Sequence, residues 1–215
     1  MGLLRNLFLD AKQKRHALVG APKYWKLKQQ FQYDFLIGHG LKEGSHLLDI
    51  GCGTLRGGIP LIKFLDDKNY TGIEVREAAL IEGRKELADE GLEYKEPKLI
   101  CFDDFSELKL DEQFDFILAF SVLFHLEDSI AKKCFEFVGR SLKNEGVFYA
   151  NVNADSGQNG KWLEFPVMHR DISFYREICQ ASGLSLKVLG KLKEFGHLTG
   201  DDKQDHQVML EIKKS

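Results

Sequence analysis

The chain has 215 residues, of which 43% are hydrophobic and 29% charged, and its formal net charge is −3 at pH 7. This composition predicts a globular protein that buries a substantial core in one domain over residues 1–215. A negative net charge gives the chain no overall electrostatic attraction to nucleic acid. No apolar stretch approaches the length of a membrane span, and residues 1–10 lack the long apolar region and cleavage site of a signal peptide, so cytoplasmic residence is expected.

Residues 1–40 are expected to form a helical cap. The first helix is indicated by apolar residues at helical spacing, which are Leu3, Leu4, Leu7 and Phe8. A second helix is expected after the break at 20–22, with a glycine stop at Gly38 or Gly40. Because the segment is basic, a helix on a membrane surface is one interpretation, and packing against the sheet or over its ligand edge is the other.

From about residue 45, short apolar runs alternate with longer amphipathic segments, a pattern typical of βαβ units. Strands are expected at 46–50, 70–75, 98–102, 114–120 and 146–152, and helices at 57–66, 76–90, 128–142 and 171–182. Two more strands, at 184–189 and 206–212, flank a stretch rich in glycine and aspartate that favours antiparallel pairing. The predicted fold class is therefore α/β, with a doubly wound, Rossmann-like, mostly parallel sheet, a C-terminal antiparallel strand pair and a helical N-terminal cap.

The join between the first strand and the first helix of this sheet, HLLDIGCGTLRGGIP at residues 46–60, passes from an acid, Asp49, into glycines. Gly51 and Gly53 let the backbone approach a ligand closely, at a place where bare N–H groups face outward. Arg56 stands where the third glycine of a GxGxxG fingerprint would be, so a pyrophosphate site is disfavoured. On its own, this stretch also fits a tight turn without a ligand.

Acids recur at the next two strand ends. Glu74 ends the second strand, where a carboxylate can accept hydrogen bonds from both hydroxyls of a ribose. Asp103 and Asp104 follow the third strand, where either could accept a hydrogen bond from an adenine amino group. Together with the glycine turn, these acids suit a nucleotide-like ligand that carries a ribose and an adenine.

The stretches LLDIGCG, GIE, FDDF and FDFILAFSVLFHL, in this order within residues 45–152, resemble the class I S-adenosylmethionine-dependent methyltransferases. The resemblance implies a cofactor-binding core at 41–152, preceded by the cap and followed by a lid loop, a helix and the terminal strands at 153–215. It also implies S-adenosylmethionine as cofactor and S-adenosylhomocysteine as product. The cofactor-binding residues that it implies are Asp49, Gly51, Cys52, Gly53, Glu74, Asp103, Asp104, Phe120 and Ser121. Many members of this family have a glycine or a small residue near the position of Leu55-Arg56. The resemblance therefore does not define the detailed path of this loop.

Methyl transfer requires the acceptor to be positioned and, for a weak nucleophile, deprotonated. His125 follows the fourth strand on the segment that the resemblance places beside the acceptor, so it is the candidate general base, with packing as the alternative role. The candidate substrate-binding residues are Arg56, Tyr24, Tyr33, His39, His169 and Arg170. Residues 153–170 combine flexible residues with aromatic ones and are expected to act as a lid. No cysteine or histidine spacing predicts a metal site.

The expected function is methyl transfer to a small-molecule acceptor. An oxygen of a sugar or a phosphorylated metabolite is favoured, because residues 55–74 resemble bacterial members associated with sugar or surface-polysaccharide pathways. The alternatives left open are a non-catalytic cofactor-binding partner protein and a protein-modifying methyltransferase. A nucleic-acid methyltransferase is disfavoured because no proline motif follows the fourth strand, and a nicotinamide-dependent oxidoreductase is disfavoured by Arg56 and the third acid. The oligomeric state stays open.

Overall fold

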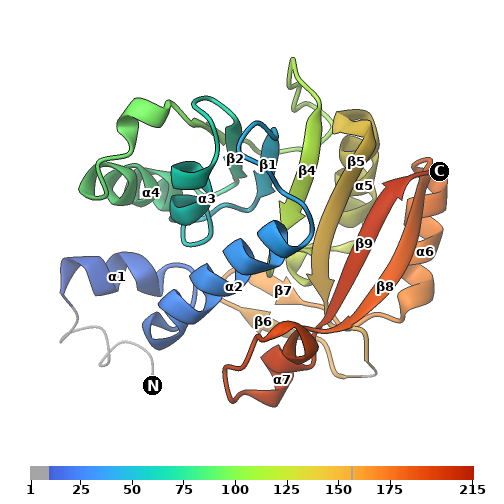
Figure 1. The fold of residues 1–215 in the computed structure, drawn as a ribbon. Helices are drawn as coiled ribbons and strands as arrows, with labels where there is room; N and C mark the ends of the chain where they lie inside the picture. Colours follow the sequence, from blue (N-terminus) through green and yellow to red (C-terminus); the bar gives the residue numbers. More distant parts are fainter. Residues whose placement is uncertain (1–9, 156) are drawn as a thin grey trace.

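The computed structural model describes residues 10–155 and 157–215, so the apolar positions of the first predicted helix, at 3–8, lie outside the described residues. Its centre is a seven-stranded sheet in the order β3-β2-β1-β4-β5-β9-β8 (Figure 1). The first five strands of that order are parallel, and β9 is antiparallel to both β5 and β8. The predicted fold class is therefore confirmed. The strands are β1 Leu47–Ile50, β2 Tyr70–Glu74, β3 Lys98–Cys101, β4 Phe114–Ala119, β5 Leu142–Val152, β8 Leu184–Lys191 and β9 Val208–Lys214.

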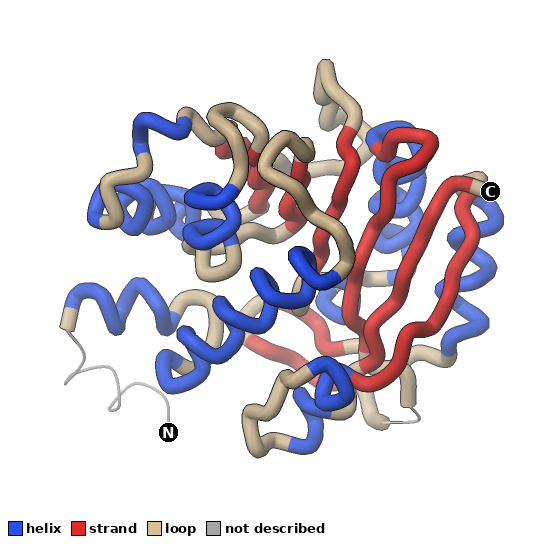
Figure 2. The backbone as a smooth tube through the Cα atoms, viewed as in Figure 1, coloured by secondary structure: helices blue, strands red, loops and turns tan. Residues whose placement is uncertain are grey.

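Helices cover both faces of this sheet (Figures 1 and 2). α5 and α6 pack on one face, and α2, α3 and α4 pack on the other. A strand covered on both faces needs apolar residues at successive positions, not only at every second one. In β1, Leu48 and Ile50 face α5 and α6, while Leu47 faces the opposite layer. The helices are α1 Ala11–Ala17, α2 Trp25–Gly38, α3 Gly58–Phe64, α4 Glu77–Asp89, α5 Asp128–Ser141, α6 Ile172–Ala181 and α7 Asp202–Asp205.

Two stretches that were predicted to be loops contain regular structure. Residues 153–170 include the short antiparallel pair β6 Gly160–Trp162 and β7 Phe165–Val167, in which Trp162 faces Phe165 in register. Residues 192–195 form a 3₁₀ helix and are followed by α7, because Leu192 is fully buried against the α2 and α3 layer and draws this polar stretch onto the core. Neither feature could be predicted from the sequence, because both stretches are rich in turn residues and a single buried apolar residue produces no periodic pattern.

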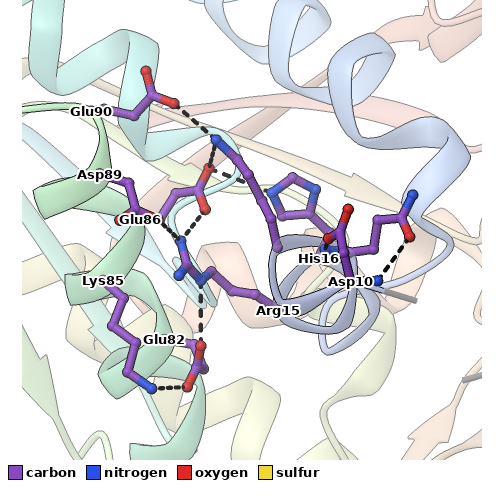
Figure 3. A network of polar contacts seen from close by, with 10 residues as sticks. Asp10, Arg15, His16, Glu82, Lys85, Glu86, Asp89 and Glu90 are labelled. Carbon is purple, nitrogen blue, oxygen red and sulfur yellow. Dashed lines mark hydrogen bonds and ion pairs between the residues drawn. The ribbon is translucent and has the colours of Figure 1, made fainter. Parts of the chain in front are cut away.

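The seven-residue helix α1 is too short to be stable alone, and a network of ion pairs binds it to α4 (Figure 3). The Arg15 guanidinium lies 2.6 Å from the Glu86 carboxylate and 2.7 Å from that of Asp89, and its Nε donates to Glu82. Lys12 adds a contact of 3.3 Å to Glu86, which is only 2% exposed. Two of the basic residues considered for a membrane surface, Lys12 and Arg15, are thus paired within the protein. None of the helices in residues 10–155 and 157–215 combines the length and apolar character that crossing a bilayer requires.

Candidate active site

A cavity of about 880 Å³ lies at the carboxyl ends of the parallel strands, where doubly wound sheets bind their ligands. Its walls come from residues that follow β1, β2, β3 and β4. Two segments far apart in the chain form its roof: residues 19–24, between α1 and α2, and the β6–β7 pair. In Figure 1 this pair and α7 lie just beyond the carboxyl end of β5. The cavity therefore joins the predicted cofactor edge to the cap.

The turn after β1 has the backbone that close approach of a ligand requires. Gly51 and Gly53 have positive φ angles of 71° and 56°. A Cβ at Gly51 would lie 2.5 Å from Val122, and one at Gly53 would lie 2.6 Å from Val19, so both positions need glycine. Leu55 also has a left-handed backbone, with φ 62°, although its side chain is fully buried in the core. Leu55 thus holds a backbone conformation that glycine adopts without strain, at a cost of about 1–2 kcal/mol.

Glu74 is fixed at the cavity wall by the backbone of two neighbours. The Gly53 N–H donates to its Oε2 at 3.0 Å, and the Arg76 N–H donates to its Oε1 at 3.0 Å. Oε1 also accepts from the Arg76 Nε at 3.4 Å, so lone-pair capacity for another donor remains on Oε2. The carboxylate is therefore oriented in advance to accept a hydrogen bond from a hydroxyl.

Arg76, which sequence reasoning missed, connects the two roof segments. Its Nη1 donates to the Leu18 carbonyl at 3.0 Å, just before residues 19–24. Its guanidinium carbon also lies 5.4 Å from the ring centroid of Phe165 and 5.9 Å from that of Trp162, within the range of cation–π attraction. One side chain beside Glu74 thus contacts both halves of the roof.

The two acids after β3 differ in their surroundings. Asp104 pairs with Lys133 and accepts a hydrogen bond from the Ser106 N–H at 2.8 Å. The hydrogen bond from Lys133 lowers the pKa of Asp104 to about 2. Asp103 also lines the cavity, and its carboxylate makes no hydrogen bond to any residue in the described parts of the chain. Asp103 is therefore the acid that is free to meet a ligand.

Asp49 lies behind the glycine turn and is buried together with its partner on β2. The Tyr70 hydroxyl donates to its Oδ2 at 2.6 Å. Burial raises the pKa of Asp49 to about 7, against the lowering effects of the Tyr70 hydrogen bond and the Arg56 charge. A small cavity of about 30 Å³, lined by Asp49, Gly51 and Arg56, adjoins the turn. A cationic group bound at the turn would favour the ionised form of this acid.

His125 lines the cavity and is held by the β6–β7 pair. Its Nδ1 lies 2.7 Å from the Pro166 carbonyl oxygen. A carbonyl only accepts, so the proton is on Nδ1 and the Nε2 of the neutral ring keeps its lone pair. Burial lowers the pKa of His125, and the charge of Arg76 lowers it further. This arrangement suits a base that is neutral at pH 7, and the ring also packs 5.4 Å from Trp162.

A buried chain of amides supports the turn after β4. Ser121 has a left-handed backbone, with φ 62°, and its N–H donates to Asn151 Oδ1 at 2.6 Å. Asn151 donates in turn to Gln207, which donates to Asn153. Ser121 and Phe120 therefore lie against the cavity on a turn that β5 and the start of β9 hold in place.

The end of the cavity at α2 and α7 is basic. Arg56 donates from Nη1 to the Val19 carbonyl at 2.8 Å, while its buried Nε has no partner among the residues described. Tyr24 and Lys28 line the same cavity, as does Lys203 of α7. Arg56 and Tyr24 of the predicted substrate set thus line the cavity, together with the two lysines.

The remaining candidates lie elsewhere. Tyr33 packs on Phe64, and His39 bonds to the Phe35 carbonyl at 2.7 Å. His169 pairs with Asp155 on the protein surface, and the buried Arg170 bonds to Asp128 and to the Leu123 and Leu126 carbonyls. Tyr33, His39, His169 and Arg170 therefore do not line the cavity, because each meets a structural partner instead. Cys52 is buried and lines only the small cavity. The described chain shows no cluster of three or more metal-ligating side chains.

Comparisons with known proteins agree with this geometry. Residues 48–148 match the family described as a methyltransferase domain. The sterol 24-C-methyltransferase of Aspergillus fumigatus is 29% identical over 134 residues, which are 60% of this chain and 33% of that protein. The chain spans a third or less of the length of the curated relatives that it matches.

Solved methyltransferases share the fold over almost the whole chain. The magnesium protoporphyrin IX methyltransferase of Synechocystis PCC 6803, solved with bound S-adenosylmethionine, superposes with a TM-score of 0.68 at 16% identity and covers 99% of this chain and 95% of its own. An S-adenosylmethionine-dependent methyltransferase from Clostridium acetobutylicum gives 0.65 at 17% identity, with coverage of 99% and 95%. At these identities the shared feature is the fold.

Proposed function

Because residues 48–148 match a methyltransferase domain, we propose that this chain transfers a methyl group from S-adenosylmethionine to a small molecule bound in the 880 Å³ cavity. The observation that carries the proposal is the continuity of this cavity from the acids Glu74 and Asp103 to the basic end at Arg56 and Lys28. A volume near the upper end of the usual range for ligand sites favours two ligands side by side. Because residues 19–24 and the β6–β7 pair cover the cavity, a small acceptor is favoured over a side chain of another protein.

The residues present fit the cofactor of this family. The cradle at Gly51 and Gly53 has no room for a Cβ, and Glu74 offers an oriented carboxylate, with capacity left on Oε2, to a ribose. Asp103 offers a free carboxylate to adenine. The buried Arg56 Nε has no hydrogen-bond partner among the described residues and can donate to the carboxylate at the methionine end of the cofactor. The Asp49 carboxylate can pair with the ammonium at the same end.

In the proposed mechanism the bound cofactor supplies an electrophilic methyl group on a sulfonium. The chain positions the acceptor in line with that group, with Ser121 and Phe120 on a braced turn. His125 accepts the acceptor's proton on Nε2 while Nδ1–H stays bonded to Pro166. An acceptor oxygen, on a sugar or a phosphorylated metabolite, fits a site that offers both a base and cationic side chains.

The first test is binding. Calorimetry with S-adenosylhomocysteine should give one site per chain, and NAD should not bind. Release of S-adenosylhomocysteine from S-adenosylmethionine should then be screened against sugar and phosphorylated acceptors. Binding of NAD in place of S-adenosylhomocysteine would refute the proposal, and binding without turnover on any acceptor would favour a non-catalytic cofactor-binding protein.

Cofactor affinity is also expected to depend on pH through Asp49. Its pKa of about 7 in the free protein means that the carboxyl must lose a proton to pair with the ligand ammonium. Affinity for S-adenosylhomocysteine should therefore fall by up to about tenfold per pH unit below pH 7. Calorimetry between pH 5.5 and 8.5 measures this dependence.

Tyr70→Phe is the matched variant for this experiment. It removes a hydrogen bond that lowers the pKa of Asp49, so the midpoint of the dependence should move to higher pH. Asp49→Asn should abolish the dependence. A profile that is flat in the wild type, or unchanged in Tyr70→Phe, would separate Asp49 from cofactor binding.

A further inference from the structure

Lys28 is one of the basic residues that line the cavity. Lys28 belongs to α2, which sequence analysis treated only as part of a cap. Its side chain is partly buried and lines the cavity, yet within residues 10–155 and 157–215 it makes no ion pair and donates no side-chain hydrogen bond. A lysine in this position needs an anion or water to satisfy three donors.

The nearby acids are already engaged. Asp205 accepts hydrogen bonds from His197, from the backbone and hydroxyl of Thr199, and from the Gly200 N–H. Asp201 accepts from the Lys203 N–H and from the side chain of Gln204. These contacts hold the loop before β9 together. Neither carboxylate lies within ion-pair distance of Lys28.

The surroundings of Lys28 disfavour its charge while the site holds no anion. Burial and the Arg56 guanidinium lower the pKa of Lys28 to about 7, although Asp201 and Asp205 raise it. His197 is buried nearby, and burial lowers its pKa to about 4, so it carries no charge at pH 7. Burial and the Arg56 charge together therefore outweigh the attraction of the two acids, and a bound anion would reverse this balance.

We propose that Lys28 binds an anionic group of the methyl acceptor, a carboxylate or a phosphate. This inference rests on the proposed methyl transfer. Arg56 lines both the main cavity and the small cavity beside Asp49 and Gly51, which places it at the methionine end of the cofactor. Lys28 lines only the main cavity, which it shares with Lys203 and Gln204 of α7, so it lies on the acceptor's side.

The test uses the complex with S-adenosylhomocysteine, and inorganic phosphate and acetate as probes. The nuclear magnetic resonance signal of the Lys28 side chain, labelled with ¹³C and assigned by its loss in Lys28→Met, reports the pKa directly. Phosphate or acetate should raise this pKa by at least one unit. The affinity of the complex for the same anion should fall at least tenfold in Lys28→Met and stay within threefold in Lys28→Arg.

Lys26→Met is the matched control, because Lys26 lies on the same helix, is exposed and does not line the cavity. It should leave anion affinity within twofold. The affinity for S-adenosylhomocysteine should stay within threefold in every variant. Melting temperatures identify any variant that fails to fold. If Lys28→Met does not fold, anion affinity is compared between Lys28→Arg and the wild type.

Two results would overturn the inference. If neither anion shifts the Lys28 signal, or if Lys28→Met leaves anion affinity unchanged, Lys28 is not an anion contact. If Lys28→Met weakens S-adenosylhomocysteine at least tenfold but leaves methylthioadenosine, which lacks the carboxylate, unaffected, then Lys28 binds the cofactor carboxylate. Failure of the wild type to bind S-adenosylhomocysteine at all would instead refute the proposed function.

Discussion

Replacing His125 by asparagine is expected to lower the single-turnover rate of methyl transfer by roughly 10²–10⁴-fold, the usual contribution of a positioned base. The amide can still bond to the Pro166 carbonyl, so the β6–β7 pair should stay in place, but it has no basic nitrogen to accept a proton. Affinity for S-adenosylhomocysteine should remain near that of the wild type. Rapid-quench measurement with saturating cofactor isolates the chemical step.

His39→Asn is a closely matched control. His39 also bonds through Nδ1 to a backbone carbonyl, at 2.7 Å, and packs on aromatic rings, but it does not line the cavity. It should change the melting temperature and leave the single-turnover rate within about twofold of wild type. If His125→Asn behaves in the same way, its role is packing, and the acceptor needs no base from this chain.

The second large effect is expected at Glu74. Glu74→Ala should weaken S-adenosylhomocysteine binding by at least roughly 1–3 kcal/mol, because charge-assisted hydrogen bonds to the ribose are lost. The structure adds a second cause, since the Gly53 and Arg76 N–H groups lose their acceptor and the glycine turn loses its support. Calorimetry against S-adenosylhomocysteine measures the loss.

Glu74→Gln separates the two causes, because the amide keeps one acceptor oxygen without the charge. Its affinity should fall between those of the wild type and Glu74→Ala. Glu77→Ala is the control: Glu77 lies three residues further on, is exposed and does not line the cavity, so affinity should not change. Unchanged affinity in Glu74→Ala would remove Glu74 from the cofactor site.

The sheet and its acidic edge could be predicted because they depend on local patterns. Strands buried on both faces read as apolar runs, and the carboxyl ends of parallel strands meet at one edge, so Glu74 and Asp103 could be placed together before their contacts were known. The turn after β1 could be placed as well, although the sequence did not predict that Leu55 takes a left-handed backbone there.

The rest of the site depends on contacts between residues far apart in the chain. His125 and Pro166 are 41 residues apart, and Asn151 and Gln207 are 56 apart. No periodicity connects such pairs, so neither the orientation of His125 nor the bracing of the turn after β4 could be derived from the sequence. The position of Lys28 could not be predicted either, because the sequence does not distinguish a cavity-lining lysine on a helix from a solvent-exposed one. Only the structure shows that α7 lines the same cavity.

The ion pairs between α1 and α4 have a consequence for kinetics. The Leu18 carbonyl accepts a hydrogen bond from Arg76 and Val19 lies against Gly53, so the stretch that follows α1 covers the glycine turn, where the proposed cofactor site has its methionine end. Several of its anchoring charges are accessible to solvent, with Lys12 49% and Asp89 53% exposed, and rising ionic strength weakens ion pairs that involve such exposed charges. Added salt should therefore loosen this cover and speed the dissociation of S-adenosylhomocysteine. If product departure limits turnover, the enzyme will run faster as ionic strength rises, even while its equilibrium affinity for the cofactor declines.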